Sequence, residues 1–129
     1  ISLIVMGCIV LTIAGFYFFS FSDSAAFSLQ KPCPFCSSAI VNEQKFYEDD
    51  LVMALYTHKP VFPGHCLIIP KRHIERFEML ADEEMVQISH AIKKIHEAAM
   101  RVFGTSSYII IQKNGLEVGQ SVPHVHFHY

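Results

Sequence analysis

Three histidines, His124, His126 and His128, occupy alternate positions near the C-terminal end of the chain. In a β-strand, alternate side chains share one face, so the three imidazoles would lie together and the residues between them would face the other way. A neutral imidazole is a nucleophile at physiological pH, and it can attack phosphorus to form a phosphoramidate that water then hydrolyses. A neighbouring imidazole can donate a hydrogen bond to the phosphate oxygens. The pattern therefore indicates chemistry on a phosphate group.

One metal ion cannot bind all three histidines. At ~3.3 Å per residue the outer two lie ~13 Å apart along a strand, whereas metal–nitrogen bonds measure ~2 Å. The segment Gly119-Gln120-Ser121 just before them offers backbone N–H donors and a hydroxyl, which suit a phosphate. The alternative interpretation is a strand that exposes its histidines to solvent, or that binds metal as an affinity tag does.

Cys33 and Cys36 form a Cys-x-x-Cys pair. Two thiolates at this spacing can share a tetrahedral zinc ion with two neutral histidines, which gives a closed structural site. Redox chemistry is the competing use, but no thioredoxin-like βαβ pattern surrounds the pair. Four cysteines in a chain with 51% hydrophobic residues do not indicate a disulfide scaffold. We favour a structural zinc ion over a reduced pair close to solvent.

The N-terminal segment and the charge balance limit the possible partners. Residues 1–21 are uncharged and long enough to cross a bilayer as a helix of ~20 residues, so they are predicted to be a membrane anchor, a signal peptide without its start, or the product of a start-site error. Residues 22–29 are predicted to be a linker and residues 30–129 one domain. Ten Lys and Arg against twelve Asp and Glu do not favour a nucleic-acid duplex as partner. A reduced cysteine pair favours a cytoplasmic location, with residues 1–21 as a candidate tether.

The rest of the chain predicts the elements that position these residues. Apolar runs bounded by turn residues predict strands at 46–47, 51–56, 65–69, 108–111 and 122–129. From Asp82 to Phe103 apolar residues recur every three or four positions, which predicts one long helix with Asp82 as its N-cap and Gly104 beyond its end. The apolar stripe of this helix is Met85, Ile88, Ile92, Ile95, Ala99 and Val102. An antiparallel sheet with one long helix packed on it predicts an α+β fold of two layers.

Three other histidines are expected at the surface. His58 lies in a proline-containing loop, and His90 and His96 lie away from the apolar stripe of the predicted helix or at its edge. None of them is assigned a role in the chemistry.

The C-terminal segment closely resembles the signature of the histidine-triad (HIT) family, which is His-φ-His-φ-His-φ-φ with φ apolar. The matching residues run from Asn114 to Tyr129, and the segment Pro63–Ile74 is also similar to a strand and turn of this family. The resemblance covers about residues 30–129 and implies a two-layer α+β domain that we expect to be truncated at its C-terminus. It implies hydrolysis or transfer of a purine nucleotide from phosphoramidates, aminoacyl adenylates or dinucleoside polyphosphates, by a homodimer without a catalytic metal.

The resemblance also implies a role for individual residues. His126 would be the nucleophile, the backbone carbonyl of His124 would fix its tautomer, and His128 and His65 would contact the phosphate or orient the site. The remaining substrate contacts would come from Gly119, Gln120 and Ser121 at the transferred phosphate and leaving group, and from Asn114 at the nucleotide.

Zinc-containing bacterial members of the family suggest the ligands of the predicted metal. Carried over to this chain, the ligands of one structural zinc ion would be Cys33, Cys36, His73 and His124. Thr57 stands about where many members have an acid or amide that binds the ribose, which predicts an altered nucleotide affinity.

Three alternative functions are consistent with these sequence features. The first is an enzyme that cleaves its substrate at the α-phosphate through a covalent nucleotidyl-His126 intermediate. The second is a zinc-stabilised module that binds nucleotides for regulation with weak or no catalysis. The third is a membrane-tethered scaffold in which the domain serves for dimerisation.

Overall fold

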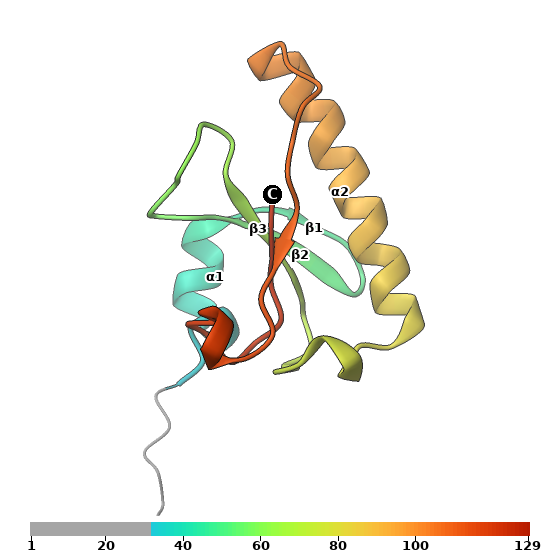
Figure 1. The fold of residues 1–129 in the computed structure, drawn as a ribbon. Helices are drawn as coiled ribbons and strands as arrows, with labels where there is room; N and C mark the ends of the chain where they lie inside the picture. Colours follow the sequence, from blue (N-terminus) through green and yellow to red (C-terminus); the bar gives the residue numbers. More distant parts are fainter. Residues whose placement is uncertain (1–31) are drawn as a thin grey trace, which may run out of the picture. The chain divides into compact units, whose positions relative to one another are not determined.

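The computed structural model describes residues 32–129 (Figure 1), so the predicted anchor at 1–21 and linker at 22–29 lie outside the described residues. The strands are β1 (Lys45–Glu48), β2 (Val52–Tyr56), β3 (Cys66–Pro70), β4 (Ile111–Gln112) and β5 (Phe127–His128). The helices are α1 (Ser38–Gln44) and α2 (Asp82–Phe103), with 3-10 turns at Pro34–Cys36, Phe77–Met79 and Leu116–Val118. Within residues 32–129, no helix has the length and apolar character needed to cross a membrane.

The five strands form one antiparallel sheet in the order β1-β2-β3-β5-β4. The strand β5 comes last in the chain but lies inside the sheet. Its residue His128 is paired with Leu67 of β3 on one side and with Ile111 of β4 on the other. The predicted α+β class is confirmed. The segment that carries the three histidines, residues 122–129, is called the histidine segment below, and its end is held by strands on both sides.

Both faces of the central strands are buried. On one face, alternate residues of β2 and β3 pack against Ile88, Ala91 and Ile95 of α2, and these residues are Val52, Ala54, Cys66 and Ile68. On the other face, the remaining residues of β2 and β3 pack against Phe35 and Val41, which precede β1 in the chain. These strand residues are Met53, Leu55, Leu67 and Ile69. Figure 1 shows α2 and α1 on opposite sides of the sheet. Because both faces are covered, these strands read as continuous apolar runs rather than as alternating ones.

The short helix α1 was not predicted. It has seven residues and no buried residue, so its sequence lacks the periodic apolar stripe that reveals α2. Its position depends on the neighbouring 3-10 turn, in which Phe35 is buried against the sheet.

The long helix α2 has the predicted bounds, but its apolar stripe is shorter than predicted and its N-cap is a different residue. Ile88 and Ile95 are buried, whereas Val102 is 72% exposed, so the stripe ends before the last turn of the helix. The N-cap is Ala81 and not the predicted Asp82. Alanine has no side chain that could cap the helix. The carboxylate of Glu84 instead reaches back and accepts a hydrogen bond from the Ala81 backbone N–H at 2.8 Å.

The two C-terminal strands are shorter than predicted. The segment 108–111 contributes only Ile111 to β4, and the segment 122–129 contributes only β5. Local hydrogen bonding explains the second difference, because the His124 N–H donates to the Val122 carbonyl at 2.8 Å and the Val125 N–H donates to the Ile74 carbonyl at 2.6 Å. These bonds turn the chain away from the ladder before β5 begins.

Candidate active site

The predicted division of the histidine segment into two faces is present in the structure. Val125 and Phe127 belong to the core beneath α2. On the opposite face, the Phe35 ring packs edge-on against the rings of His124 and His126, with centroid distances of 5.7 and 5.4 Å. His124 is fully buried and His126 is 3% exposed, so the alternative of a strand that exposes its histidines to solvent is wrong.

Backbone carbonyls define the tautomers of His124 and His126. Nε2 of His124 lies 2.9 Å from the Pro70 carbonyl oxygen, and Nδ1 of His126 lies 2.7 Å from the His124 carbonyl oxygen. A carbonyl only accepts hydrogen bonds, so in each pair the ring nitrogen carries the proton. The other nitrogen of each neutral ring then has a free lone pair, which is Nδ1 in His124 and Nε2 in His126.

A second chain of hydrogen bonds defines the tautomers of His65 and His128. The backbone N–H of Val61 donates to Nδ1 of His65 at 3.0 Å, and Nε2 of His65 lies 2.9 Å from Nδ1 of His128. Nδ1 of His65 is an acceptor, so a neutral His65 carries its proton on Nε2 and donates it to His128. His128 is then protonated on Nε2 and presents an N–H donor beside the His126 ring, whose centroid lies 5.1 Å away.

The surroundings of His124, His126 and His128 favour their uncharged forms. Burial lowers the pKa of His124 and His126 from the ordinary value of 6.5. The pKa of His128 falls to about 4, first because of burial and then because of the charges of His126, His65 and Lys113. At physiological pH the imidazoles of His126 and His128 are therefore neutral, which is the state that nucleophilic attack by His126 requires.

The turn before the histidines is held by the side chain of Gln120. This side chain is 5% exposed; its Oε1 accepts from the Gly115 N–H at 2.7 Å and its Nε2 donates to the Glu75 carbonyl at 2.8 Å. Gly119 adopts the left-handed conformation with φ of 80°, and Ser121 follows as an exposed residue. The backbone N–H groups of Gly119 and Gln120 also donate within the turn, to the Leu116 and Gly115 carbonyls at 2.9 and 3.0 Å. The amide of Gln120 thus helps to fix the shape of the turn, and the predicted phosphate contacts would come from Ser121.

Asn114, the predicted nucleotide ligand, joins the same turn to the segment before α2. Its Oδ1 accepts a hydrogen bond from the Phe77 N–H at 2.9 Å, and its Nδ2 donates to the Glu78 carboxylate at 2.8 Å. Both ends of the amide are therefore engaged within the protein in this structure.

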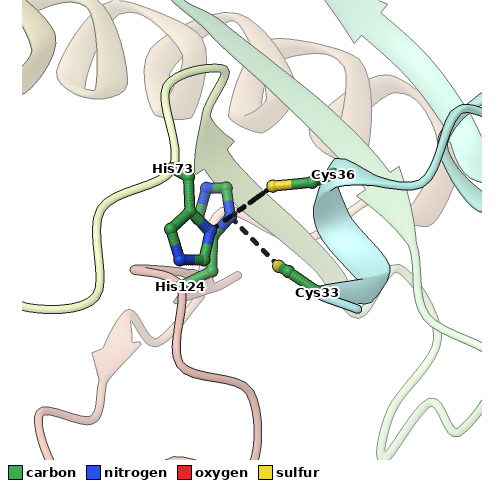
Figure 2. Close-up of side chains that lie close together, drawn as sticks. All are labelled: Cys33, Cys36, His73 and His124. Atoms are coloured by element: carbon green, nitrogen blue, oxygen red, sulfur yellow. Dashed lines mark hydrogen bonds between the residues drawn. The ribbon is translucent and has the colours of Figure 1, made fainter. Parts of the chain in front are cut away.

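The four predicted metal ligands lie together (Figure 2). The donor atoms of Cys33, Cys36, His73 and His124 all lie within 4.8 Å of one another. The Sγ atoms of Cys33 and Cys36 lie 3.5 and 3.7 Å from Nδ1 of His124, and Sγ of Cys36 lies 3.4 Å from Nδ1 of His73. A tetrahedral zinc ion separates its sulfur and nitrogen ligands by about 3.6 Å. The His124 nitrogen that faces the sulfurs is also the one with the free lone pair, so the cluster fits such an ion.

A cavity of about 740 Å³ opens beside His65 and His128. Apolar residues of the 61–64 loop, the end of α2 and the segment 108–111 form most of its wall, and Lys113 contributes a positive charge. Concave, largely apolar sites with a few polar groups are typical places for small-molecule binding.

Several residues of this site carry no recognisable signal in the sequence. Phe35 was visible only as the interior of the cysteine motif, and Lys113 only as the neighbour of Asn114. Pro70 and Val61 act through backbone atoms, for which side-chain patterns give no signal.

Comparison with known proteins identifies the family. The sequence profile of the HIT domain matches residues 39–129, and the chain therefore belongs to the HIT domain family. A crystal structure of a HIT family member from Bacillus subtilis has 38% sequence identity and a TM-score of 0.67, with 75% of this chain and 70% of that chain covered.

Two fission-yeast relatives have enzyme names. The bis(5'-nucleosyl)-tetraphosphatase [asymmetrical] of Schizosaccharomyces pombe is 36% identical over 88 residues, which cover 68% of this chain and 48% of that protein. The adenosine 5'-monophosphoramidase hnt1 of the same organism is 37% identical over 84 residues, covering 65% of this chain and 60% of the relative. The chain thus spans about half the length of the first relative and less than two thirds of the second.

The depressed pKa of His128 predicts a pH dependence of stability. As the pH falls below 6.5, the unfolded state binds the proton first, because the folded state resists protonation of His128 down to about pH 4. The contribution of this group is therefore fully present above pH 6.5 and is lost as the pH falls toward 4. Urea unfolding at pH 4.5 and pH 7 should show a smaller difference in the free energy of unfolding for His128→Asn than for the unmodified protein. The exposed His90→Asn is the control, and an identical pH dependence in all three proteins would contradict the assignment.

Proposed function

We propose that the protein is a nucleotide hydrolase that cleaves its substrate at the α-phosphate through a covalent nucleotidyl-His126 intermediate. One observation carries this proposal: Nδ1 of the buried His126 donates to the His124 carbonyl, which leaves the lone pair of Nε2 available for attack. The names of the relatives support the substrate class, since one is a bis(5'-nucleosyl)-tetraphosphatase and another an adenosine 5'-monophosphoramidase.

The reaction proceeds in two displacements. Nε2 of His126 forms a bond to the α-phosphorus while the bond from phosphorus to the leaving group breaks, and the leaving group departs with the electron pair. The hydroxyl and backbone N–H of Ser121 and the Nε2–H of His128 hydrogen-bond the phosphate oxygens and the leaving group. A water molecule then attacks the phosphorus, Nε2 regains its electron pair, and the nucleoside monophosphate and a proton are released.

A nucleotide-binding module with weak or no catalysis is the second candidate. The observation in its favour is that the amides of Gln120 and Asn114, both predicted to contact the substrate, are hydrogen-bonded at both ends within the protein. Their roles at the substrate would then need these bonds to open or would pass to backbone atoms.

A structural zinc ion held by Cys33, Cys36, His73 and His124 accompanies the proposed activity. The distances and the free Nδ1 of His124 support this ligand set. A zinc ion bound there would tie the Cys33–Cys36 turn to the histidine segment and would fix the ring of His124, the residue whose backbone carbonyl orients His126. Cysteines that ligate zinc have to stay reduced, which supports a reducing compartment such as the cytoplasm.

A homodimer formed through the β4 edge completes the proposal. β4 is the last strand of the sheet, so its outer side offers unpaired backbone groups to a second copy. Large apolar side chains beside this edge are exposed by 42 to 72%, and they are Val102, Phe103, Tyr108, Ile109 and Ile111. An edge strand with an adjoining apolar surface is suited to extending the sheet across a two-fold axis.

Replacement of the nucleophile tests the activity directly. His126→Ala should lower the release of AMP from adenosine phosphoramidate and from diadenosine tetraphosphate by at least about a thousandfold, because no other group on this face can form the intermediate. The control is His90→Ala, an exposed change on α2 that should leave the rate unaltered. Nucleotide binding without turnover by the unmodified protein would favour the binding module instead.

The metal proposal predicts a link between stability and chelation. Zinc analysis should find one ion per chain, and a strong chelator should lower the melting temperature of the unmodified protein by about 5 °C or more. Cys33→Ser should melt at the lower temperature with or without chelator. Cys66→Ala, a buried change outside the cluster, should keep its response to chelator. Equal melting of the unmodified protein under both conditions would refute the metal.

The dimer is tested by a charge at the β4 edge. Ile109→Asp should convert the protein from dimer to monomer in sedimentation velocity, because a carboxylate at this position would be buried against the second copy. Val86→Asp, a change at another exposed apolar position of the domain, should remain dimeric. A monomeric unmodified protein at micromolar concentration would exclude this assembly.

A further inference from the structure

Lys113 lies over the turn that precedes the histidines. It follows β4 directly, and its Nζ lies 3.5 Å from the position that a Cβ atom on Gly119 would occupy. The ammonium group therefore stands against the backbone of the turn that is proposed to hold the α-phosphate. This is an ordinary van der Waals distance, so the Lys113 side chain lies beside the turn.

The same ammonium group faces the catalytic histidines. Its positive charge contributes to the lowered pKa of both His126 and His128. Lys113 also lines the cavity that opens beside His65 and His128. The charge thus acts on His126 and His128 and also belongs to the wall of the cavity beside them.

Lys113 has no acidic partner within residues 32–129. The ion pairs in this part of the chain do not include it, and no hydrogen bond of its Nζ is present there. The acidic groups nearby interact with Arg76, which pairs with Glu78 and also feels the charge of Glu117. A half-buried cation that no acidic group of residues 32–129 neutralises is available to an anion that enters the cavity.

We propose that Lys113 binds the leaving-group phosphate adjacent to the α-phosphate and so makes the site select substrates with a polyphosphate leaving group over those with an amine leaving group. This inference rests on the proposed function and adds the class of leaving group to it. In an in-line displacement the phosphate joined to the α-phosphorus through the bridging oxygen departs on the side opposite Nε2 of His126, and the proposal places it in the cavity that Lys113 lines.

The chemistry of the first displacement explains the selectivity. When Nε2 of His126 bonds to the α-phosphorus, the phosphorus–oxygen bond breaks and its electron pair stays on the bridging oxygen of the departing phosphate. A fixed ammonium group beside that oxygen stabilises the new negative charge. An amine leaving group instead needs a proton on nitrogen, and a nearby fixed cation does not favour this protonation.

The test compares two substrates in Lys113→Gln. With diadenosine tetraphosphate, kcat/KM should fall at least about tenfold more than with adenosine phosphoramidate. Lys113→Arg should restore most of the ratio between the two substrates, because it restores the charge. Lys93→Gln, which removes the same charge from an exposed position of α2, should leave the ratio unaltered.

Other outcomes separate this inference from the proposed function. An equal loss on both substrates, or a ratio that Lys113→Arg does not restore, overturns the role of the charge. If the unmodified protein releases AMP from neither substrate, the proposed hydrolase activity is what fails. In that case, titration calorimetry tests whether Lys113 binds the second phosphate. Lys113→Gln should weaken the binding of ADP at least about fivefold more than that of AMP. An equal effect on both nucleotides overturns the inference.

Discussion

The position of one proton on each imidazole is the constraint on which this site depends. A neutral histidine has one donor and one acceptor nitrogen, and here main-chain atoms determine which is which. The Pro70 carbonyl accepts a hydrogen bond from Nε2 of His124 and leaves Nδ1 free beside the cysteines, while the His124 carbonyl accepts from Nδ1 of His126 and leaves Nε2 with a free lone pair. Two backbone carbonyls, one in β3 and one in the histidine segment, thereby prepare the proposed metal ligand and the proposed nucleophile.

Burial of the His124 and His126 rings maintains these hydrogen bonds. Phe35 lies between the two cysteines in sequence and packs against both rings, so the Cys-Pro-Phe-Cys segment supplies sulfur donors and also excludes water from His126. The proposed metal site and the proposed nucleophile share this wall. Loosening the segment would expose His126 and permit its protonation, which links the integrity of the cysteine cluster to the chemical state of the nucleophile.

Patterns local in sequence predicted much of the fold, and contacts between distant segments explain what was missed. The helix α2 was visible because its apolar residues repeat, and the four-residue cysteine and histidine cluster because the family resemblance supplied its pairing. The helix α1 and the early end of the strand at 122–129 depend on distant partners such as the Ile74 carbonyl. The internal bonding of Gln120 depends in the same way on Glu75, and such pairings leave no mark on the sequence near either residue.

The place of β5 in the sheet has a consequence for the order in which the domain acquires its properties. The strands β1, β2 and β3 pair as neighbours along the chain, whereas β5 enters between β3 and β4 with the whole of α2 separating it from β3. Contacts between such distant segments are entropically costly and form late in folding. A newly made chain would then collapse its apolar core well before His126 reaches its final environment. The proposed reaction with nucleotides would then occur only in fully folded molecules, and partly folded molecules would not react.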